Sequence, residues 1–114
     1  MNTYTGVAKR GQGHGTMLGF PTANIPLTDE TLDGIYAGKV TIQGKQYYAA
    51  VYANRHRSVL ESHLLGFWGE LYGQSLTVEL CQKIRESSGF ESEEKLKAAI
   101  GTDVQEVRKY FKVA

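Results

Sequence analysis

Cysteine and proline are scarce in this chain: its 114 residues include one cysteine, Cys81, and two prolines. A single cysteine cannot form an internal disulfide, which favours a reduced, cytoplasmic setting. No apolar run is long enough to cross a bilayer, and the first residues lack the basic start and the apolar core of a signal peptide. The formal net charge is only +1, so no basic field indicates a nucleic-acid partner.

The composition is ordinary for a globular protein, with 41% hydrophobic and 22% charged residues. This length suits one compact domain, so residues 1–114 are expected to form a single unit. The 13 glycines and seven tyrosines indicate tight turns between β-strands. Alternating patterns predict a mostly β protein, a closed antiparallel barrel with strands near residues 3–9, 35–42, 46–53, 59–67 and 76–83.

The C-terminal part has a helical pattern. Ser92 is a good N-cap, and the acidic residues after it favour the positive end of a helix dipole. Gly101 is predicted to end this helix, and Thr102 or Asp103 to cap a second one. We expect both helices to pack on the barrel wall without a catalytic role.

The stretch Gly19-Phe20-Pro21-Thr22-Ala23-Asn24-Ile25-Pro26 carries two small oxygen-bearing side chains two positions apart. In an extended segment, Thr22 and Asn24 point to the same side. Neutral oxygens of this kind bind Mg2+, with phosphates and water completing the shell, and the prolines stiffen the backbone around them. Taken alone, the spacing fits better a proline-bounded turn in which both side chains bond to the main chain.

The segment Gly11-Gln12-Gly13-His14-Gly15 has a glycine at every second position. Such a backbone turns sharply and approaches a ligand closely, and its N–H groups can line an anion. A Walker A motif is excluded because no Gly-Lys pair is followed by Ser or Thr, and the spacing does not fit the Rossmann fingerprint. By itself the segment is interpreted more simply as a glycine hairpin without a ligand.

Glu61 and His63 lie on one face of the predicted strand 59–67, together with Val59 and Leu65. A carboxylate on a partly apolar face is a candidate general base. The alternative is an outward face on which Glu61 pairs with a basic neighbour. The strand pattern favours neither interpretation.

Several short motifs follow one another along the chain. Gly6-Val7-Ala8, Gly13-His14-Gly15 and the run from Leu18 to Ile25 come first. Gly34-Ile35-Tyr36-Ala37, the segment from Glu61 to Leu65, and Leu71-Tyr72-Gly73 follow, and Lys83-Ile84-Arg85, Phe90 and Ser92 complete the series. In this order, and over nearly the whole chain, the motifs resemble the riboflavin kinase (flavokinase) family.

This resemblance implies a six-stranded antiparallel Greek-key β-barrel with C-terminal helices. It implies transfer of the γ-phosphoryl group of ATP to the terminal ribityl hydroxyl of riboflavin, giving FMN. Glu61 would accept the hydroxyl proton, and Thr22 and Asn24 would hold Mg2+. The nucleotide would contact Gly13, His14, Gly15, Thr22, Leu71 and Tyr72, and the flavin would be bordered by Arg85 and Phe90. A cytoplasmic monomer with small-molecule substrates, and with no nucleic-acid or membrane partner, is expected.

The sequence departs from the family pattern in the segment Ala53-Asn54-Arg55-His56-Arg57-Ser58, where relatives have a Gly-x-Arg-Pro-Thr element. This segment is shorter, lacks Gly and Pro, and is expected to border the site. His14 stands where a basic residue, often arginine, is common. The adenylyltransferase domain that precedes the kinase in many bacterial relatives is absent from this sequence, so synthesis of FAD is not expected.

Two other functions fit a barrel of this kind. One is a catalytically inactive flavin- or nucleotide-binding barrel that acts as a sensor or regulatory module. The joint presence of Thr22, Asn24 and Glu61 favours the enzyme, because a binding module needs no base. The other is an oligonucleotide-binding barrel, but stacking aromatics in a basic groove are not evident at this net charge.

Overall fold

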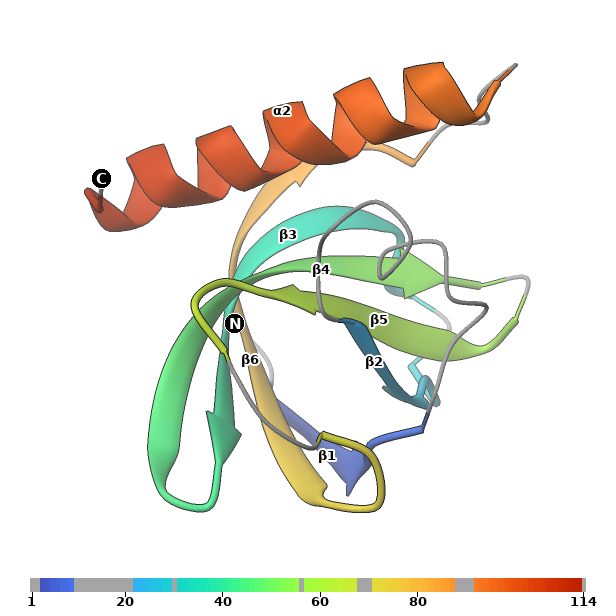
Figure 1. The fold of residues 1–114 in the computed structure, drawn as a ribbon. Helices are drawn as coiled ribbons and strands as arrows, with labels where there is room; N and C mark the ends of the chain where they lie inside the picture. Colours follow the sequence, from blue (N-terminus) through green and yellow to red (C-terminus); the bar gives the residue numbers. More distant parts are fainter. Residues whose placement is uncertain are drawn as a thin grey trace.

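The computed structural model describes residues 3–9, 22–29, 31–55, 57–67, 71–87 and 92–113. Their strands are β1 (Thr3–Val7), β2 (Thr22–Pro26), β3 (Gly34–Ile42), β4 (Lys45–Asn54), β5 (Val59–Leu64) and β6 (Ser75–Arg85), followed by the helix α2 (Glu93–Phe111). The strands form a six-stranded antiparallel sheet in the order β1-β6-β3-β4-β5-β2. The sheet curls into a barrel with α2 along one side (Figure 1).

The connection of strands β3 to β6 has the Greek-key order. β3, β4 and β5 are joined as successive neighbours, and β6 returns to pair with β3. The tight turn between β3 and β4 is made by Gln43 and Gly44, which both have positive φ angles, as two-residue hairpins require. The predicted mostly β Greek-key barrel is therefore confirmed.

The interior of the barrel is filled by every second side chain of the strands. Ile25, Leu60 and Val78 are among the fully buried residues of this core. Since successive side chains of a strand alternate between its two faces, the remaining positions point to the outside of the barrel. These outer positions carry the polar residues that sequence analysis singled out.

The barrel closes where its two edge strands, β1 and β2, meet. The backbones of Lys9 and Asn24 exchange two hydrogen bonds of 2.8 and 3.0 Å just beyond the end of β1. A Cβ atom on Gly6 would lie 3.0 Å from Cβ of Ile25 and 3.2 Å from Cδ of Pro26. The absence of a side chain at residue 6 therefore lets β1 approach β2 closely.

The C-terminal segment forms one continuous helix, α2, so the predicted break at Gly101 is wrong. Ser92 is the N-cap as predicted, and its side chain accepts a hydrogen bond from the backbone N–H of Lys95. Thr102 donates its hydroxyl to the backbone oxygen of Ala98 within the helix, so it does not cap a second helix. Among the described residues, no helix is long and apolar enough to span a membrane.

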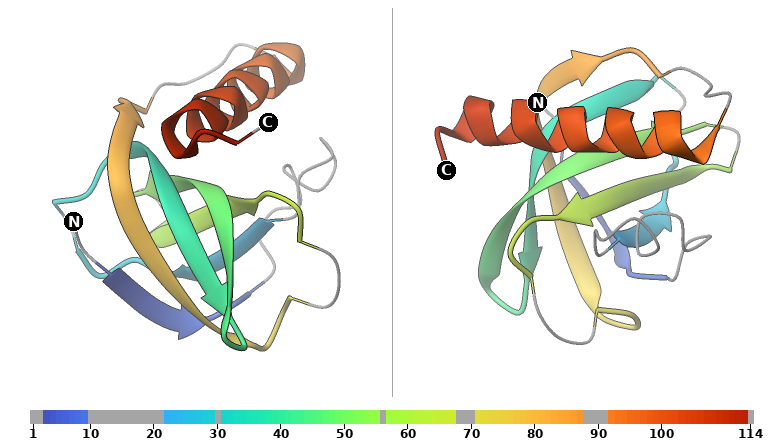
Figure 2. Two further views of the ribbon diagram at one scale, coloured as in Figure 1. Left: turned by 90° about the vertical axis from the view of Figure 1, so that its left-hand side faces the viewer. Right: turned by 45° about the horizontal axis from the view of Figure 1, so that its top comes forward.

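The helix lies across the outer side of the barrel and contacts β3, β4 and β6 (Figure 2). Its buried face includes Ile100, Val104 and Val107. Val107 packs on Ala37 of β3 and Ala50 of β4, whose small side chains leave room for the helix. The predicted packing of the C-terminal part on the barrel wall is confirmed.

Candidate active site

A row of outward-facing side chains crosses five adjacent strands. Cross-strand pairing places in register Asn24 (β2), Glu61 (β5), Tyr52 (β4), Ile35 (β3) and Arg85 (β6), which we call the outer row. Directly opposed residues of antiparallel strands share a face, with Cβ atoms about 4.5–5.5 Å apart. Asn24, Glu61 and Tyr52 are therefore immediate neighbours on the outside of the barrel.

Thr22 and Asn24 occupy alternate positions of β2, so the expected common side is confirmed and the alternative of a proline-bounded turn is not. Both are buried, and no described residue forms a hydrogen bond with Oδ1 of Asn24. A buried amide oxygen without a partner is costly, so this atom fits a site for a cation or another donor.

The described residues contain no cluster of three or more His, Cys, Asp or Glu side chains that could hold a metal. Thr22 and Asn24 would offer a cation two neutral oxygens, and a substrate or water could supply the remaining ligands. Mg2+ is commonly held in this way beside phosphates. The donor atoms in β2 fit the predicted ion.

Glu61 and His63 point to the same outer face of β5, as the strand pattern predicted. Nε2 of His63 lies 3.4 Å from Oε1 of Glu61, and the two side chains are 8% and 17% exposed. Burial lowers the pKa of His63 to about 4, although the charge of Asp103 opposes the shift. His63 is thus uncharged at neutral pH, and its contact with Glu61 joins a neutral imidazole to a carboxylate.

A cavity of about 520 Å³ opens beside the outer row, within the range of roughly 300–1,000 Å³ typical of small-molecule sites. Its wall is formed by Leu27, Asp29, Asp33, Tyr52, Ala53, Arg55, Ser58 and Ser87. Tyr52 belongs to both the cavity wall and the outer row, so it connects the cavity with Glu61. Three wall residues come from the segment 53–58, which was expected to border the site.

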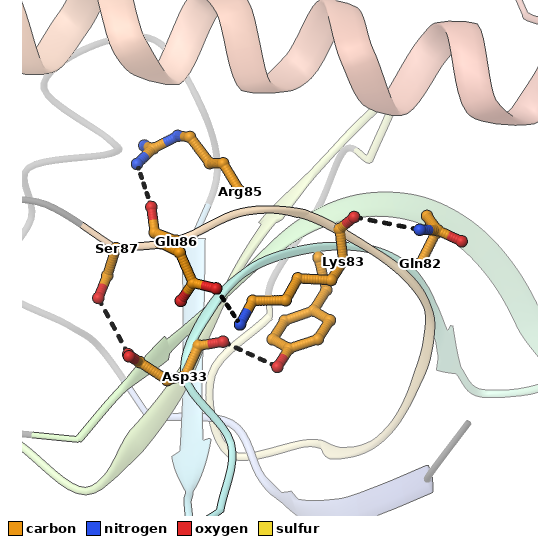
Figure 3. Close-up of polar contacts among 7 residues, drawn as sticks. Asp33, Gln82, Lys83, Arg85, Glu86 and Ser87 are labelled. Atoms are coloured by element: carbon orange, nitrogen blue, oxygen red, sulfur yellow. Dashed lines mark hydrogen bonds and ion pairs between the residues drawn. The ribbon is translucent and has the colours of Figure 1, made fainter.

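One rim of the cavity joins the start of β3 to the end of β6 (Figure 3). Ser87 donates its hydroxyl to Oδ1 of Asp33 at 2.9 Å, and Lys83 forms an ion pair of 2.9 Å with Glu86. Tyr52 lines the same cavity, and burial, reinforced by the charges of Asp33 and Glu61, raises the pKa of its phenol. The phenol therefore keeps its proton at neutral pH and can donate a hydrogen bond.

Arg85 joins the barrel to the helix. Its Nε and Nη2 donate to the two carboxylate oxygens of Asp103 at 2.7 and 2.9 Å, and its Nη1 donates to the backbone oxygen of Glu86. Figure 3 shows the bond to Glu86, with the guanidinium turned toward α2. Asp103 was expected to cap a helix, but its carboxylate holds Arg85 instead. A contact between Arg85 and flavin stays a prediction.

The predicted nucleotide contacts near the start of β2 are partly described. The hydroxyl of Tyr72 donates to the backbone oxygen of Thr22 at 3.1 Å, which brings the Leu71-Tyr72-Gly73 turn against β2. Leu71 is buried in the barrel core, so its side chain packs inward. Gly13, His14, Gly15 and Phe90 lie outside the described residues.

Tyr52, Asp33 and Ser87 were not singled out from the sequence. Tyr52 lies in a predicted strand with two other tyrosines, and the alternation alone does not tell which of them faces a cavity. Asp33 and Ser87 are 54 positions apart and are brought together by the pairing of β3 with β6. Only the pairing of Tyr52 with Glu61 could have indicated Tyr52. Predicting that pairing from the sequence would have required the length of the turn between β4 and β5.

Comparison with known proteins identifies the family. Residues 2–111 match the family model described as riboflavin kinase (flavokinase). A bifunctional riboflavin kinase/FMN adenylyltransferase of Haemophilus influenzae is 36% identical over 107 residues, covering 85% of this chain and 34% of the relative. The chain thus spans about a third of the length of this curated relative.

Two crystal structures have the same fold. A riboflavin kinase from Trypanosoma brucei has a TM-score of 0.66 and 25% identity, covering 96% of this chain and 79% of that one. A structure described as a macrolide-efflux protein from Streptococcus pneumoniae has a TM-score of 0.77 and 27% identity, covering 93% of this chain and 38% of that one. With the matched family model spanning nearly all residues, the chain belongs to the riboflavin kinase family.

Proposed function

We propose that residues 1–114 form a riboflavin kinase domain that transfers the γ-phosphoryl group of ATP to the terminal hydroxyl of the ribityl chain, giving FMN and ADP. The outer row carries this proposal. Across three adjacent strands it runs from a buried amide oxygen at Asn24, through the carboxylate of Glu61, to the cavity wall at Tyr52. A phosphoryl donor, a base and an acceptor pocket have to follow one another in this order.

In the proposed reaction, Glu61 accepts the proton of the terminal ribityl hydroxyl. The hydroxyl oxygen forms a bond with the γ-phosphorus, and the bond between that phosphorus and ADP breaks. The transition state of phosphoryl transfer is loose, so positioning and electrostatic stabilisation supply most of the catalysis. A mostly buried carboxylate next to a cavity is well suited to take the proton, because little water competes for it.

Thr22 and Asn24 would hold Mg2+ beside the phosphates, where its charge would offset the negative charge of the transferred group. The buried oxygen of Asn24, which no described residue contacts through a hydrogen bond, supports this assignment. Gly13, His14, Gly15, Leu71 and Tyr72 would contact the nucleotide. For Leu71 this contact would come from the backbone, since its side chain packs in the core.

The cavity would hold the flavin, with Arg55 and Ser58 on its wall and with Arg85 and Phe90 bordering the ligand. The cavity volume and its polar lining support this placement of the acceptor. The guanidinium of Arg85 is held by Asp103 of α2, so the main effect of Arg85 on the flavin site would be to fix the helix beside it. A cytoplasmic monomer acting on small molecules is the setting in which we expect this activity.

The test is to incubate the purified chain with riboflavin, ATP and Mg2+ and to measure FMN by chromatography. Glu61→Gln keeps the size of the side chain and removes the base, so we expect FMN formation to fall about 10²–10⁴-fold. Glu79→Gln changes an exposed carboxylate on β6 and serves as the matched control, with activity like that of the wild type. Unchanged turnover of Glu61→Gln would refute the role of the base.

The same assay with Asn24→Ala tests the cation site. We expect weaker binding of Mg-ATP, measured by titration calorimetry, with binding of riboflavin alone unchanged. The hydrogen bonds between the backbones of Asn24 and Lys9 do not depend on the side chain, so the barrel is retained. If the wild type binds flavin or ATP but makes no FMN, the chain is instead a binding module, the second function considered from the sequence.

A further inference from the structure

Tyr52 differs in its hydrogen bonding from three other tyrosines of the barrel. Tyr4, Tyr36 and Tyr72 each donate the phenolic proton to an oxygen of the protein, at 2.9, 2.8 and 3.1 Å. Among the described residues, none forms a hydrogen bond with the hydroxyl of Tyr52, although this side chain is half-buried and lines the cavity. The hydroxyl of a cavity-lining residue that has no hydrogen-bond partner among the described residues is a candidate to bind a ligand.

The position of Tyr52 limits what such a ligand group can be. Tyr52 is the direct neighbour of Glu61 across β4 and β5. Of the other wall residues, Ala53 is opposite Leu60, and the rest lie in the connections between elements. In the proposed reaction the hydroxyl that reacts must reach Glu61. The part of the acceptor that passes Tyr52 is therefore the chain that carries this hydroxyl, and the ring system is left to the rest of the cavity.

The phenol of Tyr52 and the hydroxyls of the acceptor chain have matching hydrogen-bonding properties. A polyhydroxyl chain presents hydroxyls that both donate and accept, and so does a protonated phenol. The raised pKa of the Tyr52 phenol keeps it protonated throughout the neutral range. Asp33, a carboxylate in the cavity wall, already accepts a hydrogen bond from Ser87 and lies where β3 begins and β6 ends, so it is not in register with Glu61.

We propose that Tyr52 is a specificity residue whose hydroxyl binds the polyhydroxyl chain of the acceptor and so directs its terminal hydroxyl toward Glu61. The proposal rests on the proposed kinase function and adds to it the group that selects a flavin with a sugar-alcohol chain. Phenylalanine at this position would keep the packing and remove the hydrogen bond.

The test compares two ligands with the same ring system: riboflavin, and lumiflavin, which has a methyl group in place of the ribityl chain. Affinities are measured by quenching of flavin fluorescence for the wild type and Tyr52→Phe. We expect Tyr52→Phe to weaken riboflavin binding about three- to tenfold, the usual effect of one lost hydrogen bond, and to leave lumiflavin binding unchanged. Tyr110→Phe, an exposed position on α2, is the control and should change neither affinity.

Three results would overturn the proposal. Equal weakening of both ligands would assign Tyr52 to the ring or to the shape of the pocket, and no change in either would leave it without a role. A wild type that does not prefer riboflavin over lumiflavin would refute it without any variant. In each case FMN formation by the wild type would show that the kinase function itself stands, whereas absence of both FMN and flavin binding would refute the two together.

Discussion

Burial in the fold disfavours the charged form of His63. His63 lies on the outer face of β5, nearly fully buried, and its imidazole contacts Glu61. Because burial penalises the charged form, the pKa of His63 is lowered from 6.5 to about 4. The unfolded chain therefore binds a proton at this residue over a pH range in which the folded chain does not.

We predict that the protein loses stability as the pH falls from 6.5 toward 4. Above 6.5 the imidazole is neutral in both states, so His63 imposes no penalty there. Between the two values protons favour the unfolded chain, with a total effect of at most about 3 kcal/mol. Urea unfolding at pH 7, 5.5 and 4.5 measures the loss.

His63→Gln isolates this effect, because glutamine keeps a donor near Glu61 and does not titrate. The free energy of unfolding of this variant should depend less on pH than that of the wild type over this window. Equal pH dependence of the two proteins would show that His63 takes up its proton without hindrance in the folded state.

The common face of Thr22 with Asn24, and of Glu61 with His63, followed from the sequence because the period of a strand is two. The burial of Asn24 and the position of Tyr52 between Glu61 and the cavity did not follow. They depend on which strand lies beside which, and the pairing of β2 with β5 connects residues 37 positions apart, as in Asn24 and Glu61. Local patterns contain no information on such pairs.

Gly101 illustrates the limits of local signals at the scale of an element. A glycine inside a helix costs about 1 kcal/mol relative to alanine, and this cost is usually met at a helix end. In α2 it is offset by the burial of Ile100 and Val104 on either side, and by the attachment of Asp103 to Arg85. Tertiary contacts therefore extend the helix past a residue that would end it in isolation.

We predict that Gly101→Ala stabilises the protein by up to about 1 kcal/mol, because alanine is the better helix former. Apart from the adjoining residues and the backbone of the helix itself, no atom of the described residues lies within 4 Å of a Cβ built at this residue, so the added methyl group meets no obstacle among them. Thermal or denaturant unfolding measures the gain. A loss of stability would mean that the backbone near Gly101 cannot accept a side chain.

Gly38→Ala is the matched comparison, since the same methyl group is added in the middle of β3. There a Cβ would lie 2.8 Å from the backbone oxygen of Glu79 and 2.9 Å from Cγ2 of Val51. Overpacking of this kind costs roughly 1–3 kcal/mol. The free energy of unfolding is therefore expected to rise in Gly101→Ala and to fall in Gly38→Ala, although both variants gain the same methyl group.

At the scale of the whole molecule, one ion pair ties the helix to the end of the barrel. The side chain of Asp103 is 6% exposed and that of Arg85 is 30% exposed, and the two meet through two parallel hydrogen bonds. Asp103→Asn keeps the shape and removes the charge, so a half-buried guanidinium loses its partner. We predict a loss of about 1–3 kcal/mol in the free energy of unfolding.

Lys109→Gln provides the comparison, because it breaks an exposed ion pair with Glu106 on the same helix. Exposed pairs contribute little, so no measurable change is expected. If Asp103→Asn also left the free energy of unfolding unchanged, the packing of Val107 and its neighbours would hold the helix without the ion pair between Arg85 and Asp103.

The class of fold was predictable because alternation, turns and motifs all pointed to a β-barrel. The cavity was not, since its wall combines residues from the start of β3, the end of β4 and the segments that follow β2, β4 and β6. Only the closed barrel brings these chain segments to one end. A cavity formed in this way is a property of the assembled sheet.

The meeting of β1 and β2 has a consequence for encounters between molecules. An edge strand with unpaired backbone groups can recruit a strand from another chain and so start aggregation. Here the two edges of the sheet face each other, joined by Lys9 and Asn24, and Pro26 at the end of β2 has no N–H to offer. The junction that completes the barrel thus also covers part of the edge along which a neighbouring copy could add a strand.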